Sequence, residues 1–298
     1  MDGYDETTYG DAFADVYDDW YAAISDVEAT TKTLLELADG GSVLELGVGT
    51  GRLAVPLATA GRDRGVTVAG LDAVRTADMV VTDRLGPVSI LDELDPGIEV
   101  IDVGKVPFGP ATPQEEINRI LVEHARRGRT VVRLKGGDSF LFGRGAEEHL
   151  ACTAAGVPVT VIPGVTSALS VPALAGVPAT HRGLSQGVSV ISGHVPPDSP
   201  HSTLDYGALA RSGTTLVLLM AVTTLPAITA ELLAEGMPGD TPAVLVENGS
   251  TPAERVLHGT LATIARQAAE AQVAPPAITV IGAVAGLAGQ LSAGASCG

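Results

Sequence analysis

Residues 130–145, TVVRLKGGDSFLFGRG, constrain the fold more than any other stretch of the chain. A β-branched run ending at Leu134 predicts a buried strand, and Gly136-Gly137 then opens a loop. Adjacent glycines let a ligand approach the backbone because no Cβ blocks it, and Asp138 adds a carboxylate. In an open α/β sheet such a loop lies at the carboxyl ends of the strands, where ligands bind. The glycine pattern alone also suits an ordinary turn.

Four further motifs stand in order around this loop. They are PQEEIN at 113–118, PGVTSA at 163–168, THR at 180–182 and VENG at 246–249. Together with the loop they resemble the uroporphyrinogen-III C-methyltransferases of the tetrapyrrole methylase family, which are S-adenosylmethionine enzymes at the entry to sirohaem and cobalamin synthesis. The resemblance runs from about residue 66 to residue 288. It implies S-adenosyl-L-methionine as cofactor, uroporphyrinogen III as substrate, precorrin-2 as product and, as is usual in the family, a homodimer.

The resemblance implies cofactor-binding residues on several separate segments. In chain order they are Gly136, Gly137, Asp138, Leu141, Thr166, Ser167, Met220, Gly249 and Ala277. Thr166 and Ser167 stand at a turn where a helix is expected to begin, and exposed N–H groups at a helix start suit a ligand carboxylate. Met220, taken alone, is more typical of core packing at the end of an apolar strand.

Two ionisable residues match positions to which the family's proposed mechanism assigns proton transfer. Asp83, which follows an apolar run, is implied as the proton acceptor, and Lys105 is implied as the proton donor. Methyl transfer to carbon needs a positioned nucleophile and a base that removes a proton. Among the basic residues near the Gly-rich loop, Arg144 is the one expected to face the substrate. From the residues alone, Asp83 and Lys105 also suit surface charges or an ion pair at strand ends.

Short β-branched runs alternate with Ala- and Leu-rich helical patterns from Asp83 onward. The runs span residues 130–134, 157–162, 188–192, 215–219, 243–246 and 278–281. This alternation predicts an α/β protein layered around mainly parallel sheets. The resemblance implies the class III tetrapyrrole methylase fold, in which two α/β domains, residues 41–163 and 164–288, hold the cofactor in the cleft between them. Residues 70–85 resemble the first helix and second strand of that family.

The N-terminal part of the chain follows a different pattern. Residues 11–37 predict an amphipathic helix within an acidic helical extension, residues 1–40. Ser42–Gly51 then runs from an apolar strand into GVGTG, which resembles the opening of a class I S-adenosylmethionine methyltransferase, and Thr67–Asp72 would be its second strand. The chain therefore reads as a fusion joined near Gly65–Ala73, without the G-x-G-P-G-D-P loop that opens tetrapyrrole methylases.

Charge and composition narrow the class of partner. The net charge is −17, and residues 1–40, with eleven acidic residues and one lysine, contribute −10 of it. Nucleic acid is not expected as a partner because binding it calls for a basic face. No apolar run reaches the ~18 residues of a membrane span, and the first residues do not resemble a secretory signal. Cys152 and Cys297 have neither disulfide nor metal-ligand spacing, so we expect a cytoplasmic protein without metal.

Alternatives to an active uroporphyrinogen-III C-methyltransferase stay open. One is a catalytically impaired fusion that keeps the tetrapyrrole methylase body but lacks the first Gly-rich loop. Another is a sibling precorrin methyltransferase, although PQEEIN and Phe142–Gly145 favour the uroporphyrinogen branch. A working class I methyltransferase is disfavoured because its later strands do not follow. A nicotinamide enzyme is disfavoured because GVGTG lacks the G-x-G-x-x-G spacing.

Overall fold

The computed structural model describes residues 67–83, 88–104 and 112–292. The chain divides into two units, residues 1–64 and 65–298, and every described residue belongs to the second. The predictions for the acidic helix, for the class I-like strand and turn, and for Lys105 therefore lie outside the described residues. No helix in these ranges has the length and hydropathy that crossing a membrane requires.

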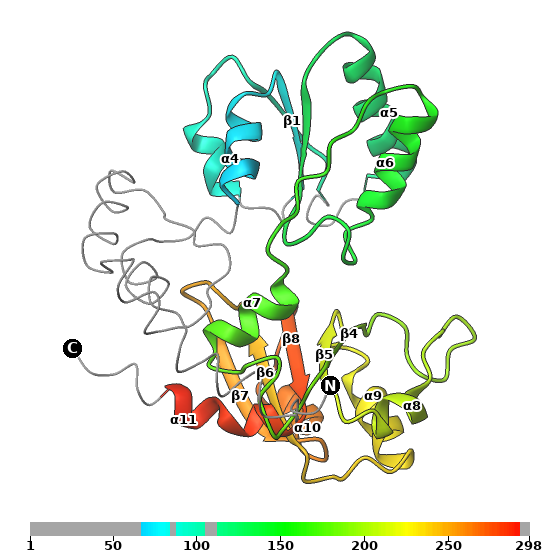
Figure 1. Cartoon of the computed structure of the whole chain (residues 1–298), viewed down its shortest axis with the longest axis vertical. Helices are drawn as coiled ribbons and strands as arrows, with labels where there is room; N and C mark the ends of the chain where they lie inside the picture. The colour runs from blue at the N-terminus through cyan, green and yellow to red at the C-terminus, as the bar shows by residue number, and fades with distance from the viewer. Residues whose placement is uncertain (1–66, 84–87, 105–111, 293–298) are drawn as a thin grey trace, which may run out of the picture. The chain divides into compact units, whose positions relative to one another are not determined.

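The described elements build two sheets, each with helices packed on it (Figure 1). The first group consists of α4 (Val68–Arg75), β1 (Met79–Thr82), the 3₁₀ helix η1 (Val88–Glu93), β2 (Glu99–Asp102), α5 (Gln114–Arg126), β3 (Val131–Leu134) and α6 (Gly145–Ala154). The second group consists of α7 (Ser167–Leu174), β4 (Val188–Ser192), α8 (Tyr206–Arg211), β5 (Thr215–Leu219), α9 (Leu225–Ala234), β6 (Pro242–Glu247), β7 (Arg255–Thr260), α10 (Ile264–Glu270), β8 (Ala277–Ile281), the 3₁₀ helix η2 (Ala283–Leu287) and α11 (Ala288–Ser292).

The first sheet has three parallel strands in the order β2-β1-β3. Its central strand β1 is buried along its whole length, because both of its faces are covered. Met79 and Val81 pack with side chains of α5 and α6 on one face. Val80 packs with side chains of α4 and η1 on the other. The continuous apolar run Met79–Val81 thus follows from burial on two sides.

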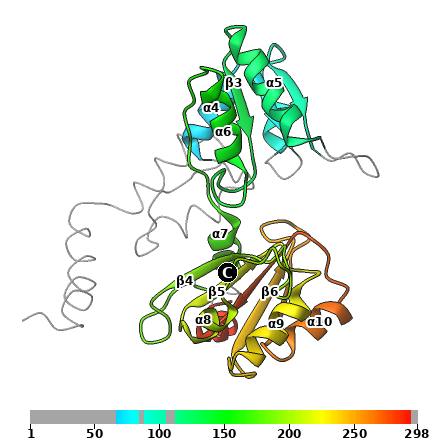
Figure 2. The same cartoon turned by 90° about the vertical axis from the view of Figure 1, so that its right-hand side faces the viewer.

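The second sheet has five strands in the order β4-β5-β8-β6-β7. Helices α8, α9 and α10 cover one face, where Leu216, Leu218 and Leu245 belong to the larger core cluster (Figure 2). Helix α7 and the η2–α11 segment cover the other face, around Val217 and Val244. Alternate residues of β5 therefore point into two different cores, which explains why the four residues Leu216–Leu219 are all apolar.

The strand directions correct the prediction of mainly parallel sheets. That prediction is right for the first sheet but wrong for the second, where β4–β5 is the one pair of neighbouring strands that is parallel. The pairs β5–β8, β8–β6 and β6–β7 are antiparallel. The chain turns back after β6 through a hairpin and enters β8 against its neighbours. The local alternation of strands and helices does not specify this direction.

Two predicted strands are wrong. Thr67–Asp72, expected to be a strand, is the beginning of α4, because the Thr67 hydroxyl accepts a hydrogen bond from the Gly70 N–H at 3.2 Å and caps the helix. No strand is assigned to residues 157–162 either. Val159 and Val161 are exposed there, so their β-branched side chains lack the packed sheet surface that favours a strand. The domain boundary predicted at residues 163 and 164 falls between α6 and α7 and stays a prediction.

We predict that Leu245→Ala lowers the free energy of unfolding by about 2–5 kcal/mol, because Leu245 lies in β6 with 0% exposure and its truncation leaves a cavity. Leu150→Ala is the matched control, since Leu150 is 67% exposed on α6 and its truncation should change stability by under about 0.5 kcal/mol. Urea unfolding followed by circular dichroism measures both values. Equal losses for the two variants would contradict this packing.

Candidate active site

Asp83 lies at the carboxyl end of the first sheet, directly after β1. The neighbouring strand β3 is parallel to β1 and ends in register with it, with Thr82 opposite Leu134. Side chains that follow the two strands therefore meet at one edge, where ligands bind in sheets of this kind. The Asp83 carboxylate accepts a hydrogen bond there from the Arg133 guanidinium at 2.8 Å. Asp83 is thus a half-buried member of an ion pair rather than a solvated surface charge.

Arg133 lies on the sheet face that α5 and α6 cover, opposite Val81 in register. Its Nη2 contacts Asp83, and its Nε donates to Glu148 at 3.2 Å. Its Nη1 donates to the backbone carbonyls of Val81 and Leu134 at 3.3 and 2.8 Å. A guanidinium presents its donors in a rigid planar fork, so these contacts fix its orientation. The fork in turn fixes the Asp83 carboxylate at the end of β1.

Glu148 is a buried carboxylate that sequence reasoning missed. It lies on α6 with 5% exposure. It accepts hydrogen bonds from Arg133, from Lys135 at 3.0 and 3.1 Å, and from Gln114 of α5 at 3.2 Å. The helical spacing of the sequence indicated that Glu148 is buried, because it lies on the same face of α6 as the buried residues Gly145 and Cys152. A charge on that face predicts a buried partner.

Burial also shifts the pKa values of two groups near Glu148. It lowers the pKa of Lys135 below its usual range, and the positive charge of Arg133 lowers that pKa further. The negative charges of Glu148 and Asp83 offset part of this decrease. Burial, followed by the charge of Glu148, raises the pKa of the Cys152 thiol. Two cations and two carboxylates therefore neutralise one another at this edge of the sheet.

The Gly-rich loop after β3 is held by the Asp138 carboxylate. One oxygen accepts from the Phe140 N–H at 2.9 Å, and the other accepts from the Gly164 N–H at 3.1 Å. A Cβ on Gly164 would lie 2.1 Å from the Gly137 carbonyl oxygen, so only glycine allows this approach. Two of the motifs noted in the sequence, the loop and PGVTSA, are therefore one structural unit.

Helix α7 begins where this unit ends. Thr166 is its N-cap, and its hydroxyl accepts from the Ala168 N–H at 3.2 Å, which confirms the helix start expected there. Gly137, in the left-handed conformation with φ +66°, lies with its Cα hydrogens toward Thr166 and the Ser167 N–H. The structure thus brings Gly137, Asp138, Thr166 and Ser167 together. Leu141, further along the loop, packs against the core cluster that α7 helps to form.

The second half of the loop is strongly bent. Phe142 and Arg144 both have left-handed backbone, with φ 56° and 57°. A Cβ on Gly143 or Gly145 would lie 2.7 or 2.5 Å from the Ser139 carbonyl oxygen. Arg144 is exposed, and its guanidinium pairs with Glu147 on the next turn of α6 at 2.7 and 2.8 Å. Its predicted role toward a substrate stays a prediction.

The remaining predicted cofactor residues lie at one edge of the second sheet. Met220 follows β5, Gly249 lies beyond the end of β6, and Ala277 begins β8. The antiparallel registers place Ala277 opposite Glu247 and Ile278 opposite Leu219. The register therefore gathers these three residues, which are far apart in the sequence.

Their environments differ. Met220 is 49% exposed and has φ 57°, so it does not pack in the core, and its strained backbone is of the kind found at functional sites. A Cβ on Gly249, by contrast, would meet the Val171 side chain of α7 at 2.3 Å. Close packing on α7 alone accounts for a glycine there.

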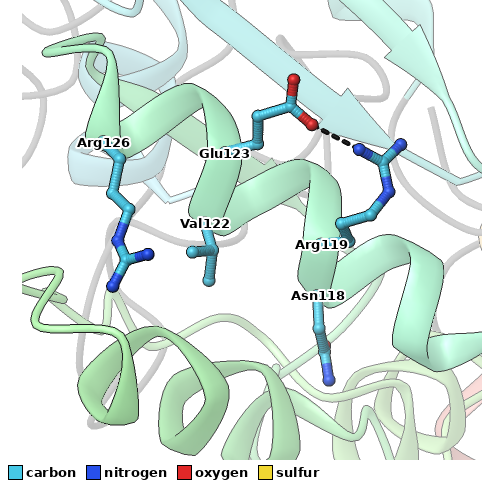
Figure 3. Close-up of a pocket in the computed structure, with 5 residues that line it drawn as sticks. All are labelled: Asn118, Arg119, Val122, Glu123 and Arg126. Atoms are coloured by element: carbon cyan, nitrogen blue, oxygen red, sulfur yellow. Dashed lines mark hydrogen bonds and ion pairs between the residues drawn. The ribbon is translucent and has the colours of Figure 1, made fainter.

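The other basic residues near the Gly-rich loop are engaged elsewhere. Arg126 donates to the Ala155 carbonyl at 2.7 Å, Arg127 pairs with Glu123, and Arg129 pairs with Glu99 at 2.5 Å. A pocket along α5 is lined by Asn118, Arg119, Val122, Glu123 and Arg126 (Figure 3). Within this pocket Arg119 pairs with Glu123, and no predicted site residue lines the pocket.

Comparison with known proteins assigns the family. The sequence model of the tetrapyrrole (corrin/porphyrin) methylases matches residues 59–265. The chain belongs to the tetrapyrrole methylase family, and it is a methyltransferase. It is 44% identical over 211 residues to an S-adenosyl-L-methionine-dependent uroporphyrinogen III methyltransferase of Methanosarcina barkeri, covering 71% of this chain and 83% of that protein.

Solved structures of the family share the fold. The uroporphyrin-III C-methyl transferase of Thermus thermophilus, complexed with S-adenosylhomocysteine, matches with a TM-score of 0.61 and 40% identity over 73% of this chain and 91% of that chain. A cobalt precorrin-4 methyltransferase matches with a TM-score of 0.67 at 24% identity, over 75% of this chain and 91% of that chain. These matches confirm the predicted α/β tetrapyrrole methylase fold.

Longer relatives match as well. The siroheme synthase of Tolumonas auensis is 42% identical over 254 residues, which cover 85% of this chain but 51% of that protein. The chain thus spans about half the length of this relative. The class I resemblance of residues 42–51 stays a prediction.

We predict that Gly164→Ala lowers the free energy of unfolding by about 1–3 kcal/mol, because the new Cβ would meet backbone that cannot yield without moving the Gly-rich loop. Gly289→Ala is the control. Nothing lies within 4 Å of its Cβ position in α11, and alanine there should be neutral or stabilising by up to about 1 kcal/mol. Thermal unfolding compares the two variants, and equal effects would contradict the close approach of Gly164 to the loop.

Proposed function

We propose that the chain catalyses the S-adenosylmethionine-dependent C-methylation of uroporphyrinogen III to precorrin-2. The observation that carries this proposal is the clamped unit in which Asp138 ties the Gly-rich loop to the start of α7. The relatives from M. barkeri and T. thermophilus, named for uroporphyrinogen and uroporphyrin methylation, support the substrate class. The proposal covers methylation alone, because the chain spans only about half of the siroheme synthase it matches.

Two groups of residues suit the cofactor. The first is Gly136–Asp138 with Thr166 and Ser167, where a left-handed glycine and the N–H groups at the start of an eight-residue helix leave backbone donors for a carboxylate. The second is the sheet edge with Met220, Gly249 and Ala277, where an exposed methionine offers an apolar, polarisable surface. When bound, S-adenosylmethionine supplies a methyl group activated by its sulfonium. The chain's own residues bind and orient it.

Asp83 is the proposed proton acceptor. The methyl cation adds to a ring carbon that bears no hydrogen and S-adenosylhomocysteine leaves, so the methylated tetrapyrrole becomes neutral by losing a proton from another of its atoms. A positioned carboxylate can take that proton. Arg133 holds the Asp83 carboxylate at the strand end, which suits that role. Lys105 as proton donor, Arg144 as a substrate contact, a homodimer and a cytoplasmic location stay predictions.

We predict that Asp138→Ala weakens binding of S-adenosylhomocysteine at least tenfold. The variant removes two charge-assisted hydrogen bonds, to Phe140 and Gly164, so the loop is no longer tied to the start of α7. Losing about 1.4 kcal/mol of binding energy already corresponds to a factor of ten. Calorimetric titration of the full chain measures the dissociation constant.

Asp95→Ala is the matched control for Asp138→Ala. Asp95 makes the same kind of carboxylate contact, accepting from the Gly97 N–H at 2.8 Å, in an exposed turn before β2. Its loss should leave binding of S-adenosylhomocysteine unchanged. If Asp138→Ala bound the ligand with the affinity of Asp95→Ala, the assignment of the Gly-rich loop to the cofactor would be wrong.

We predict that the wild-type chain transfers labelled methyl groups to uroporphyrinogen III under anaerobic conditions, and that Asp83→Asn lowers turnover by about 10²–10⁴. Asn keeps the size of the side chain but cannot take up a proton, so the affinity for S-adenosylhomocysteine should stay within about twofold. Asp78→Asn is the control, because Asp78 stands at the opposite end of β1 and its carboxylate accepts from the Thr130 N–H at 2.7 Å.

The outcomes separate the alternatives. A wild-type chain that binds S-adenosylhomocysteine but methylates nothing would be the catalytically impaired fusion. Methylation of a precorrin but not of uroporphyrinogen III would assign the sibling activity. Normal turnover by Asp83→Asn would remove Asp83 as the proton acceptor.

A further inference from the structure

We propose that Glu148 is the positioning residue for Asp83 and that it acts through Arg133 and Lys135. The inference rests on the proposed function, in which Asp83 accepts the proton. Glu148 is itself too deeply buried, at 5% exposure, to be a surface group on α6. Its hydrogen bonds to Arg133 and Lys135 lead toward Asp83.

The first link runs through Arg133. A guanidinium is fixed by the partners at its several donors, and Arg133 has Glu148 at Nε, backbone carbonyls at Nη1 and Asp83 at Nη2. Glu148 and Asp83 thus bind neighbouring edges of one rigid plane. Removing the Glu148 charge frees one edge of that plane to turn, and the Asp83 carboxylate turns with it.

The second link runs through Lys135. Its ammonium contacts both oxygens of Glu148, and its side chain is only 10% exposed. A buried cation needs a carboxylate partner because water does not solvate it there. Without the charge of Glu148, Asp83 is the remaining carboxylate of this network for both cations. Glu148 therefore keeps Lys135 away from the proposed proton acceptor.

A third contact fixes Glu148 itself. Gln114, at the start of α5, donates to the same oxygen of Glu148 that Arg133 contacts, at 3.2 Å, and also donates to Asn118 at 3.1 Å. Gln114 and Asn118 are polar residues of PQEEIN, whereas Ile117 of the same motif packs in the core of the first sheet. The motif thereby acquires a physical role, which is to lock the rotamer of Glu148 between two helices.

The test is a double-mutant cycle in the full chain with uroporphyrinogen III and S-adenosylmethionine. Glu148→Gln keeps the size and one acceptor but removes the charge. We expect kcat to fall about ten- to a hundredfold, the scale of a small misplacement of a reacting group, while KM and the affinity for S-adenosylhomocysteine stay within about twofold. In the Asp83→Asn background the same change should have no further effect on kcat, because Glu148 acts through Asp83.

Two control variants distinguish a specific loss of kcat from a general loss of stability. Ile264→Val, in the core of the second sheet with 0% exposure, should cause a small loss of thermal stability without lowering kcat. Glu148→Asp keeps the charge but withdraws the carboxylate by one methylene, and it enters the same cycle should Glu148→Gln not fold. Unchanged kcat in both Glu148 variants would overturn the proposal, and so would an equal loss with and without Asp83.

A second readout does not depend on activity. The Arg133 Nε–H signal in a ¹⁵N-arginine-labelled protein reports its hydrogen bond to Glu148 and should shift or broaden in Glu148→Gln. An unchanged signal would overturn the coupling even in an active enzyme. If the signal changes but the wild-type chain methylates no uroporphyrinogen III, the proposed function fails while the coupling between Glu148 and Arg133 stands.

Discussion

Arg133 is a full positive charge on a sheet face that otherwise packs apolar side chains against α5 and α6. Such a charge is tolerated only where its donors are satisfied, and here two carboxylates and two backbone carbonyls satisfy them. The arrangement of the first sheet depends on this interaction. It joins α6 to the sheet through Glu148, which Lys135 also contacts, and it holds the Asp83 carboxylate after β1.

The sequence predicted the elements well where local signals are sufficient. The runs at 188–192 and 215–219 became β4 and β5 with the expected bounds, because β-branched residues between turn signals need only local information. The direction of β8 was missed. Thr67–Asp72 was wrongly expected as a class I strand, whereas the reading of residues 70–85 as a helix and a strand agrees with α4 and β1. Strand direction depends on distant partners, and the Thr67 cap competes with a short apolar run that also suits a strand.

In the candidate site, too, residues with local sequence signals could be predicted, and residues whose role depends on distant partners could not. The Gly-rich loop and the start of α7 could be predicted because glycine and capping residues carry local meaning. The helical period of α6 indicates that Glu148 is buried, but no short motif identifies its partners, which lie 13 to 65 positions away and are brought together by the parallel register and by helix packing. Gly249 shows the opposite error, in which a residue is assigned to a binding site although packing alone explains it. A glycine expected to bind cofactor has a packing reason of its own, the side chain of Val171.

Met220 and Asp138 indicate how ligand binding is separated from folding in this chain. Met220 lies half-exposed on strained backbone and is not part of the buried core. Asp138 does the reverse, because its carboxylate is occupied by two backbone N–H groups and so fixes the loop instead of waiting for a ligand. A loop held in this way loses little conformational entropy on binding. The proposed binding site therefore combines a residue on strained backbone, Met220, with a loop that Asp138 holds rigid.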